Sequence, residues 1–200
     1  MRTNRKWQWR VTTDTPIDRP VPYLVAAAVA SKWQREALQA VADLGLPDCW
    51  IAAGFVRNAV WDLLHGYRSP TPLADIDVLF FDEHNDRNES EFEAFLTAAL
   101  PQHTWQVRNQ ARMHRVNGFA PFRSSGQAMW HWVETPTAVG LAMDRLGRLQ
   151  IKAPLGVGDL MGLRLQPGPM FRTDRRGIYR ERVRAKRWAE RWPRLRVLGT

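Results

Sequence analysis

The chain has 200 residues and a mass of 23.1 kDa, which is the size of one ordinary domain or of a domain with tails. Its hydrophobic fraction of 44% and charged fraction of 24% exclude a fully disordered, collagen-like or coiled-coil chain. The formal net charge of +9 and the sequence pI near 10.7 are typical of a nucleic-acid-binding protein.

The positive charge is concentrated at the two ends of the chain. Residues 1–10 carry a net charge of +4, residues 172–196 carry +8, and the stretch between them carries −3. A slightly acidic centre is therefore expected between two basic ends. The stretch 172–196 is either a solvated helix face, a surface that binds RNA or another polyanionic acceptor, or a region that attracts NTP phosphates.

Features of secreted and membrane proteins are missing from the sequence. Cys49 is the single cysteine, which excludes an intramolecular disulfide. No apolar run approaches the roughly 18 residues of a membrane span, and the basic first ten residues lack the apolar segment of a signal peptide. We expect a cytoplasmic protein with no membrane partner.

In chain order, the first part of the sequence predicts helices that alternate with strands. Residues 1–20 have no periodicity and are expected to form an arm or loop. Apolar residues three and four apart predict helices over 21–44 and 55–65, and short apolar runs predict strands over 49–53 and 75–81.

The second part of the sequence predicts a helix, a strand, a hairpin and further helices. In chain order these are a helix over 89–100, a strand over 105–107, a mixed stretch over 109–122, a short helix over 124–132, a β-hairpin over 139–151, a helix over 158–165 and a basic helix over 175–192.

The mixture of elements predicts the α/β (α+β) fold class. We divide the chain into a basic N-terminal arm over residues 1–20, a domain over 21–171, and a basic helical extension over 172–200 packed on the same domain.

The first motif lies where the predicted strand 49–53 meets the helix after it. Gly54 ends the strand, and Arg57 and Asn58 open the helix. A glycine allows the backbone to come close to a ligand, and the free N–H groups of a helix start, helped by Arg57, would hold a phosphate. Asn58 is equally consistent with a polar group at the start of a helix.

The second motif is a pair of carboxylates at the start of the predicted strand 75–81. Because side chains alternate along a strand, Asp75 and Asp77 share one face and Ile76 points to the other. Two carboxylates about 7 Å apart on a rigid strand suit one or two Mg²⁺ or Mn²⁺ ions. A phosphate site beside such a pair is what nucleotidyl transfer needs.

The two motifs together resemble the nucleotidyltransferase superfamily of DNA polymerase β, above all its tRNA CCA-adding and poly(A) polymerases. Over nearly the whole chain, the sequence also resembles a family of small bacterial nucleotidyltransferase proteins. The segments that carry this resemblance are RNAVWDLLHG, DIDVLFFD, NQARMH and WVETPTAVG. The resemblance implies a polymerase β-like fold, a mixed sheet flanked by helices, with Asp75 and Asp77 as catalytic metal ligands.

The chain departs from the superfamily pattern at several positions. Ala53 stands where relatives usually carry a second glycine, and the segment before Asp75 is longer than in the CCA-adding enzymes. Asn58 replaces the aspartate of the Arg-Asp pair, and Asn109 occupies the slot in which many relatives carry a third carboxylate. Glu134, which precedes the predicted hairpin, is the better candidate for a third metal ligand. The segment around Asn109 has no clear period, so Asn109, Gln110, Arg112 and His114 either line the substrate site or belong to the scaffold.

These observations favour an Mg²⁺-dependent nucleotidyltransferase. It would move an NMP from an NTP to an unidentified acceptor hydroxyl and release pyrophosphate. The alternative is a catalytically inactive nucleotide- or RNA-binding protein of the same fold. A third hypothesis is a nucleic-acid-binding module whose basic ends carry the function and whose core is vestigial.

Overall fold

The computed structural model describes residues 20–200. The arm expected over residues 1–20 therefore lies, apart from Pro20, outside the described residues. Within residues 20–200, no helix combines the length and the apolar character that crossing a bilayer requires.

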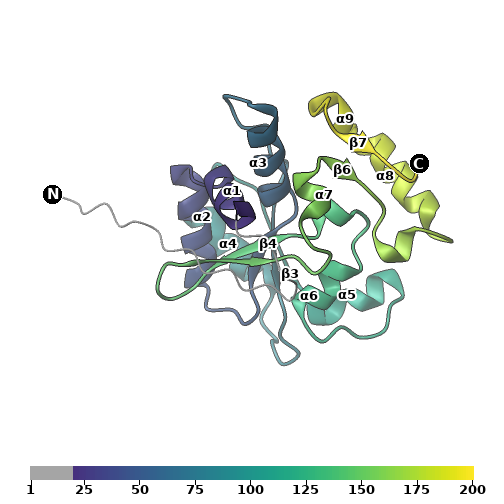
Figure 1. Cartoon of the computed structure of the whole chain (residues 1–200). Helices are drawn as coiled ribbons and strands as arrows, with labels where there is room; N and C mark the ends of the chain where they lie inside the picture. Colours follow the sequence, from purple (N-terminus) through teal and green to yellow (C-terminus); the bar gives the residue numbers. More distant parts are fainter. Residues whose placement is uncertain (1–19) are drawn as a thin grey trace.

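A five-stranded mixed sheet forms the centre of the protein (Figure 1). Its strands are β1 (Trp50–Ala52), β2 (Ile76–Phe80), β3 (Trp105–Asn109), β4 (Gly140–Met143) and β5 (Leu149–Lys152). Their spatial order is β3-β2-β1-β4-β5. The β2–β3 pair is parallel, and the other neighbours are antiparallel.

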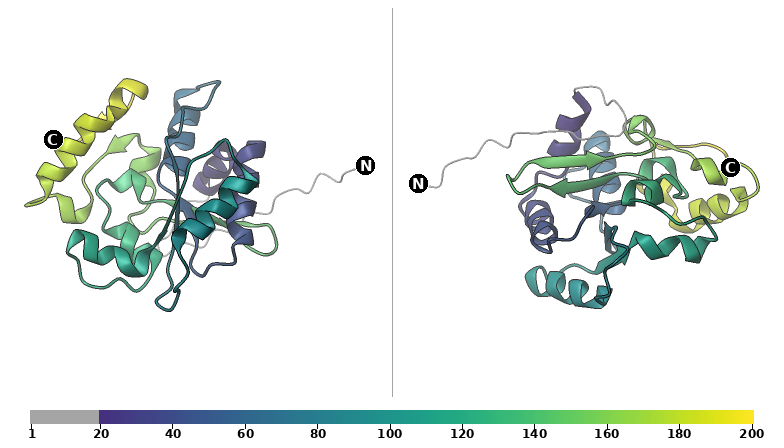
Figure 2. Two further views of the ribbon diagram at one scale, coloured as in Figure 1. Left: turned by 180° about the vertical axis from the view of Figure 1, so that it is seen from behind. Right: turned by 90° about the horizontal axis from the view of Figure 1, so that it is seen from below.

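Helices cover both faces of this sheet, so the predicted α/β class with a mixed, helix-flanked sheet is confirmed (Figures 1 and 2). The α-helices are α1 (Pro20–Ala28), α2 (Lys32–Asp43), α3 (Gly54–His65), α4 (Glu89–Ala99), α5 (Gln110–Asn117), α6 (Ser125–Trp130), α7 (Gly158–Met161), α8 (Arg176–Lys186) and α9 (Trp188–Arg191). Two 3₁₀ turns, η1 (Thr135–Thr137) and η2 (Pro169–Phe171), and a small parallel pair, β6 (Arg164–Leu165) with β7 (Arg196–Val197), complete the fold.

The alternation along β2 separates an apolar face from a polar one. Ile76, Val78 and Phe80 are each at most 1% exposed and join the main core. Asp77 and Leu79 point to the opposite face because successive side chains alternate. A shift of one residue in the β1–β2 register would turn Asp77 into the apolar core, so the pattern itself fixes the register.

The helix predicted over residues 21–44 is two helices. Ser31 has extended backbone angles, and its hydroxyl accepts a hydrogen bond from the backbone N–H of Gln34. This is an N-cap, which ends the extended stretch after α1 and starts α2. Because the apolar residues keep a helical spacing across the break between α1 and α2, the sequence pattern does not reveal it.

The helix predicted over residues 175–192 is likewise interrupted. Arg187 has φ 50°, a left-handed conformation that ends α8 and begins α9. The helix predicted over 158–165 stops at Met161, and its last residues form β6. A strand of two residues is too short to show a period in the sequence.

The C-terminal helices are attached to the domain through buried aromatic side chains. Tyr179, Trp188 and Trp192 are each at most 2% exposed. The Tyr179 hydroxyl lies 2.8 Å from the carbonyl oxygen of Leu165, at the end of β6, and 2.7 Å from that of Leu198. These contacts hold α8 against the small β6–β7 pair.

Replacing Tyr179 by phenylalanine should lower the free energy of unfolding by about 1–2 kcal/mol, because the carbonyl groups of Leu165 and Leu198 lose the single hydroxyl proton that they share. Denaturant unfolding monitored by circular dichroism measures this change. Tyr67→Phe is the matched control, since the Tyr67 hydroxyl bonds to the Arg191 carbonyl at an exposed position. An equal cost for the two substitutions would contradict the prediction.

Candidate active site

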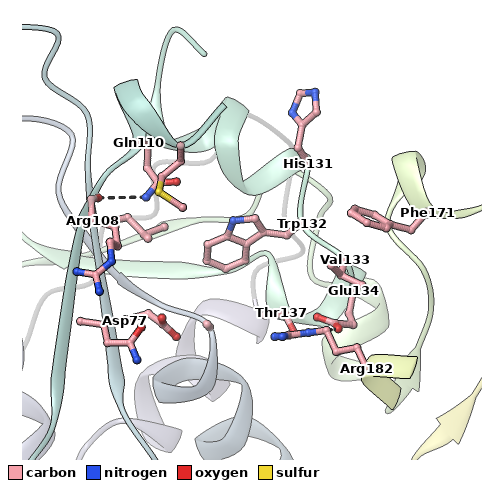
Figure 3. A pocket seen from close by; sticks show the side chains of 14 residues that line it. Asp77, Arg108, Gln110, His131, Trp132, Val133, Glu134, Thr137, Phe171 and Arg182 are labelled. Carbon is pink, nitrogen blue, oxygen red and sulfur yellow. Dashed lines mark hydrogen bonds and ion pairs between the residues drawn. The ribbon is translucent and has the colours of Figure 1, made fainter. Parts of the chain in front are cut away.

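A cavity of about 320 Å³ lies over the polar face of β2 and β3 (Figure 3). Its floor comes from alternate residues of these strands and the residue after β3, namely Asp77, Leu79, Gln106, Arg108 and Gln110. The facing wall includes Trp132, Glu134, Thr137, Phe171 and Arg182. The cavity is thus framed by charges of both signs around the Trp132 indole.

The surroundings of Asp77 disfavour the ionised form of its carboxylate. Burial first, and the charge of the neighbouring Asp75 second, raise the pKa of Asp77 to about 6, although the charges of Arg57, Arg182 and Lys186 act in the opposite direction. Asp75 precedes β2, and its Oδ2 accepts a hydrogen bond of 2.7 Å from Gln106 Nε2. Two carboxylates that repel each other at a cavity wall form a site that a cation would stabilise.

The donor chemistry of this pair fits a divalent metal ion. Asp75 and Asp77 are both partly exposed, and carboxylate oxygens are the ligands that Mg²⁺ and Mn²⁺ prefer. In the described part of the chain, no three His, Cys, Asp or Glu side chains form a group that could hold a metal. The pair therefore offers two protein carboxylates.

The structure does not bring Glu134 into a group with Asp75 and Asp77, which corrects its assignment as a third metal ligand. Glu134 is 1% exposed, and its Oε1 accepts a bond of 2.5 Å from Arg182 Nε. A buried carboxylate needs a paired cation, and the arginine of α8 meets this need.

The sequence predicts that Gly54, Arg57 and Asn58 hold a phosphate. In the structure, Gly54 faces Leu73, and the side chains of Arg57 and Asn58 are engaged inside the protein. A Cβ on Gly54 would meet Leu73 Cδ2 at 3.2 Å, so its open side faces protein. Arg57 is buried, and its guanidinium donates to Thr137 Oγ1 at 2.9 Å and to Asn58 Oδ1 at 2.9 Å. The guanidinium and the Asn58 side chain thus satisfy each other within the scaffold.

The backbone at the start of α3 nevertheless adjoins the cavity. Ala53 lines the cavity wall and has φ 52°, a conformation that costs a non-glycine residue of order 1 to 3 kcal/mol. Within residues 20–200, no side-chain hydrogen bond caps the N-terminus of α3. This helix start therefore has the N–H groups and the dipole end that favour an anion.

Among the four candidates in the NQARMH segment, only Gln110 lines the cavity. Asn109 is 1% exposed and caps α5, because its side chain accepts from the backbone N–H of Ala111. Arg112 donates to the carbonyl of Asn85, and the His114 ring packs against Phe122. The segment is the N-cap and the first turns of α5, although its sequence has no clear helical period.

Most residues of the cavity wall were not among the candidates from the sequence, and Arg108, Trp132 and Arg182 are three of them. Arg108 shares the period of two with Gln106 and Gln110, which was a usable signal in β3. Trp132 and Arg182 reach the cavity through long-range packing of α6 and α8, and nothing in the local sequence indicates this.

Comparisons with known proteins agree on one family. Residues 39–197 match the family model described as "Nucleotidyltransferase". A protein whose NMR structure "reveals a CCA-adding enzyme head domain" shares 34% identity with the chain and has a TM-score of 0.76. The match covers 88% of this chain and 95% of that one. No curated protein matches the chain.

A larger solved structure, a CCA-adding enzyme in an apo form, is similar in fold alone. It shares 16% identity with a TM-score of 0.50, and the match covers 92% of this chain but 41% of that one. The chain thus spans less than half of that enzyme.

Without divalent cations at pH 8, Asp77→Asn should raise the free energy of unfolding by about 1–2 kcal/mol, because it removes a charge that burial and Asp75 oppose. The folded pKa near 6 lies above the ordinary 3.8, so wild-type stability falls as pH rises through 6. The gain should shrink below pH 6 and vanish near pH 4.

Urea unfolding across a pH series measures this difference. Asp86→Asn changes the same charge at an exposed position and should leave stability unchanged. A gain that does not depend on pH would contradict the prediction.

Proposed function

The chain belongs to the nucleotidyltransferase family, and we propose that it transfers an NMP from an NTP to an acceptor hydroxyl with the help of Mg²⁺ or Mn²⁺. The acceptor oxygen forms a bond to the α-phosphorus. The bond between the α-phosphorus and the bridging oxygen breaks, pyrophosphate leaves with the electron pair, and the hydroxyl proton passes to solvent. Positioning and charge neutralisation supply most of the catalysis in such reactions.

The pair Asp75 and Asp77 is the observation that carries this proposal. Both belong to one face at the start of β2, and Asp77 lines the cavity floor. We assign them as the ligands of the divalent cation, which when bound neutralises phosphate charge and orients the reacting groups. Asp75 is oriented by the hydrogen bond from Gln106, so this carboxylate is held in place in advance.

The start of α3 is the second element of the proposed site. The chain turns sharply at Ala53, and Gly54 begins the helix at the cavity wall. Backbone N–H groups at an uncapped helix start favour phosphate oxygens. Arg57 contributes through its charge, which acts on Asp77, rather than through a direct contact.

RNA or another polyanionic acceptor is the partner that the surface charge favours. The stretch 172–196 carries a net charge of +8, and most of its arginines are exposed on α8, α9 and the segments around them. The solved relative at 34% identity is described as a CCA-adding enzyme head domain, which supports an RNA end as the acceptor. Such binding should weaken steeply with salt.

Purified protein with Mg²⁺ or Mn²⁺ should transfer label from an α-labelled NTP to RNA or to a small hydroxyl acceptor. Asp77→Ala should reduce this transfer by at least about 1000-fold, because a cation ligand is lost, and should leave the circular dichroism spectrum unchanged. Asp86→Ala, at an exposed position, is the control and should retain full activity.

Two results would contradict the proposal. Transfer that survives Asp77→Ala would place the reaction elsewhere. Nucleotide binding without transfer to any acceptor would instead support the inactive nucleotide- or RNA-binding protein of the same fold.

A further inference from the structure

Helix α8 contributes a cation to the cavity, although it lies more than 100 residues after the carboxylates. Arg182 lines the cavity wall, and Figure 3 shows its side chain next to Glu134. The side chain is 40% exposed, so its guanidinium is accessible from the cavity. The basic segment is therefore part of the site as well as of the surface.

The guanidinium of Arg182 is hydrogen-bonded to Glu134 through its Nε. Its Nε donates to Glu134 Oε1 at 2.5 Å, and its Cζ lies over the Trp188 ring, 5.9 Å from the ring centroid. Across the described residues, its two terminal nitrogens make no hydrogen bond. These are the donors that bind phosphate oxygens in a bidentate manner.

Helix α8 and strand β2 meet at the same cavity. Arg182 and Asp77 both line it, and the exposed Lys186 follows Arg182 by four residues on the same face of α8. A polyanion next to Asp77 would therefore meet the guanidinium of Arg182, whereas Arg57 is buried against Thr137 and Asn58.

We propose that Arg182 binds the β- and γ-phosphates of the NTP and then the pyrophosphate product, and that Glu134 is the positioning residue that orients Arg182. This inference rests on the proposed function and names the groups that hold its substrate. The sequence had assigned this role to Arg57 and had considered Glu134 as a metal ligand.

The helix that carries these cations is fixed before any ligand binds. Tyr179 contacts two carbonyl groups, and Trp188 packs against the buried guanidinium of Arg57 with a centroid distance of 4.9 Å. Arg182 lies between these two anchors along the chain. A cation held in place in advance loses little entropy on binding and stabilises charge that develops on the leaving group.

Calorimetric binding of inorganic tripolyphosphate tests this assignment without turnover. Arg182→Ala should weaken tripolyphosphate and NTP about 10- to 100-fold, the effect expected for charge-assisted hydrogen bonds, and leave NMP affinity within about twofold. Arg182→Lys keeps the charge but loses the planar donors, so it should give an intermediate loss. Arg145→Ala removes an equal charge at an exposed turn and should bind as wild type.

Glu134→Gln distinguishes positioning from metal ligation. Its Mn²⁺ affinity, measured by electron paramagnetic resonance, should stay within about twofold of wild type if Glu134 only orients Arg182. A tenfold loss of Mn²⁺ affinity would overturn this part of the proposal. Because Arg182→Ala alone leaves Glu134 buried and unpaired, the double variant Glu134→Gln/Arg182→Ala repeats the tripolyphosphate measurement in a neutral background.

Unchanged tripolyphosphate affinity in both variants that carry Arg182→Ala would overturn the assignment. So would a loss confined to RNA oligonucleotide binding, which would place Arg182 on the acceptor surface instead. If tripolyphosphate binding depends on Arg182 but no acceptor is ever labelled, the phosphate site stands and the proposed transfer reaction fails.

Discussion

One buried guanidinium connects the parts of the protein that form the site. The Cζ of Arg57 lies over the rings of Trp61 and Trp188, at 5.3 and 4.9 Å from their centroids, and the guanidinium donates to Thr137. Burial lowers the pKa of Arg57 to about 10, so it stays charged at neutral pH. A buried cation requires compensation from partners on every side. These partners come from α3, η1 and α9, which fixes their mutual position.

An acidic side chain from the sheet and a basic side chain from α8 lie on facing walls of the cavity. Asp77 lines the cavity on the side of the sheet, with Asp75 next to it, and Arg182 and Glu134 belong to the facing wall. Burial and the charge of Asp75 both disfavour the ionised carboxylate of Asp77, so the protein gives up stability to keep it beside Asp75. This arrangement suits a ligand that brings a cation to the carboxylates and phosphate oxygens to Arg182.

Local patterns in the sequence predicted the sheet face and the carboxylate pair, because a period of two is visible within five residues of β2. The family resemblance was confirmed for the same reason, since its motifs are local. The environment of Arg57 could not be predicted, because Thr137 and Trp188 are 80 and more residues away. Asn109 was ambiguous, because one side chain serves equally well as a cap or as a lining residue.

The contact between Trp188 and Arg57 can form only late in synthesis. The strands of the sheet leave the ribosome before α8 and α9, so the guanidinium of Arg57 lacks its contact with the Trp188 ring until residue 188 emerges. Before that moment, burying the guanidinium would leave a charge poorly compensated. The docking of α8 and α9 therefore covers Arg57 with Trp188 and adds Arg182 to the cavity wall. A chain that ends before α8 would keep the carboxylate pair and lack Arg182.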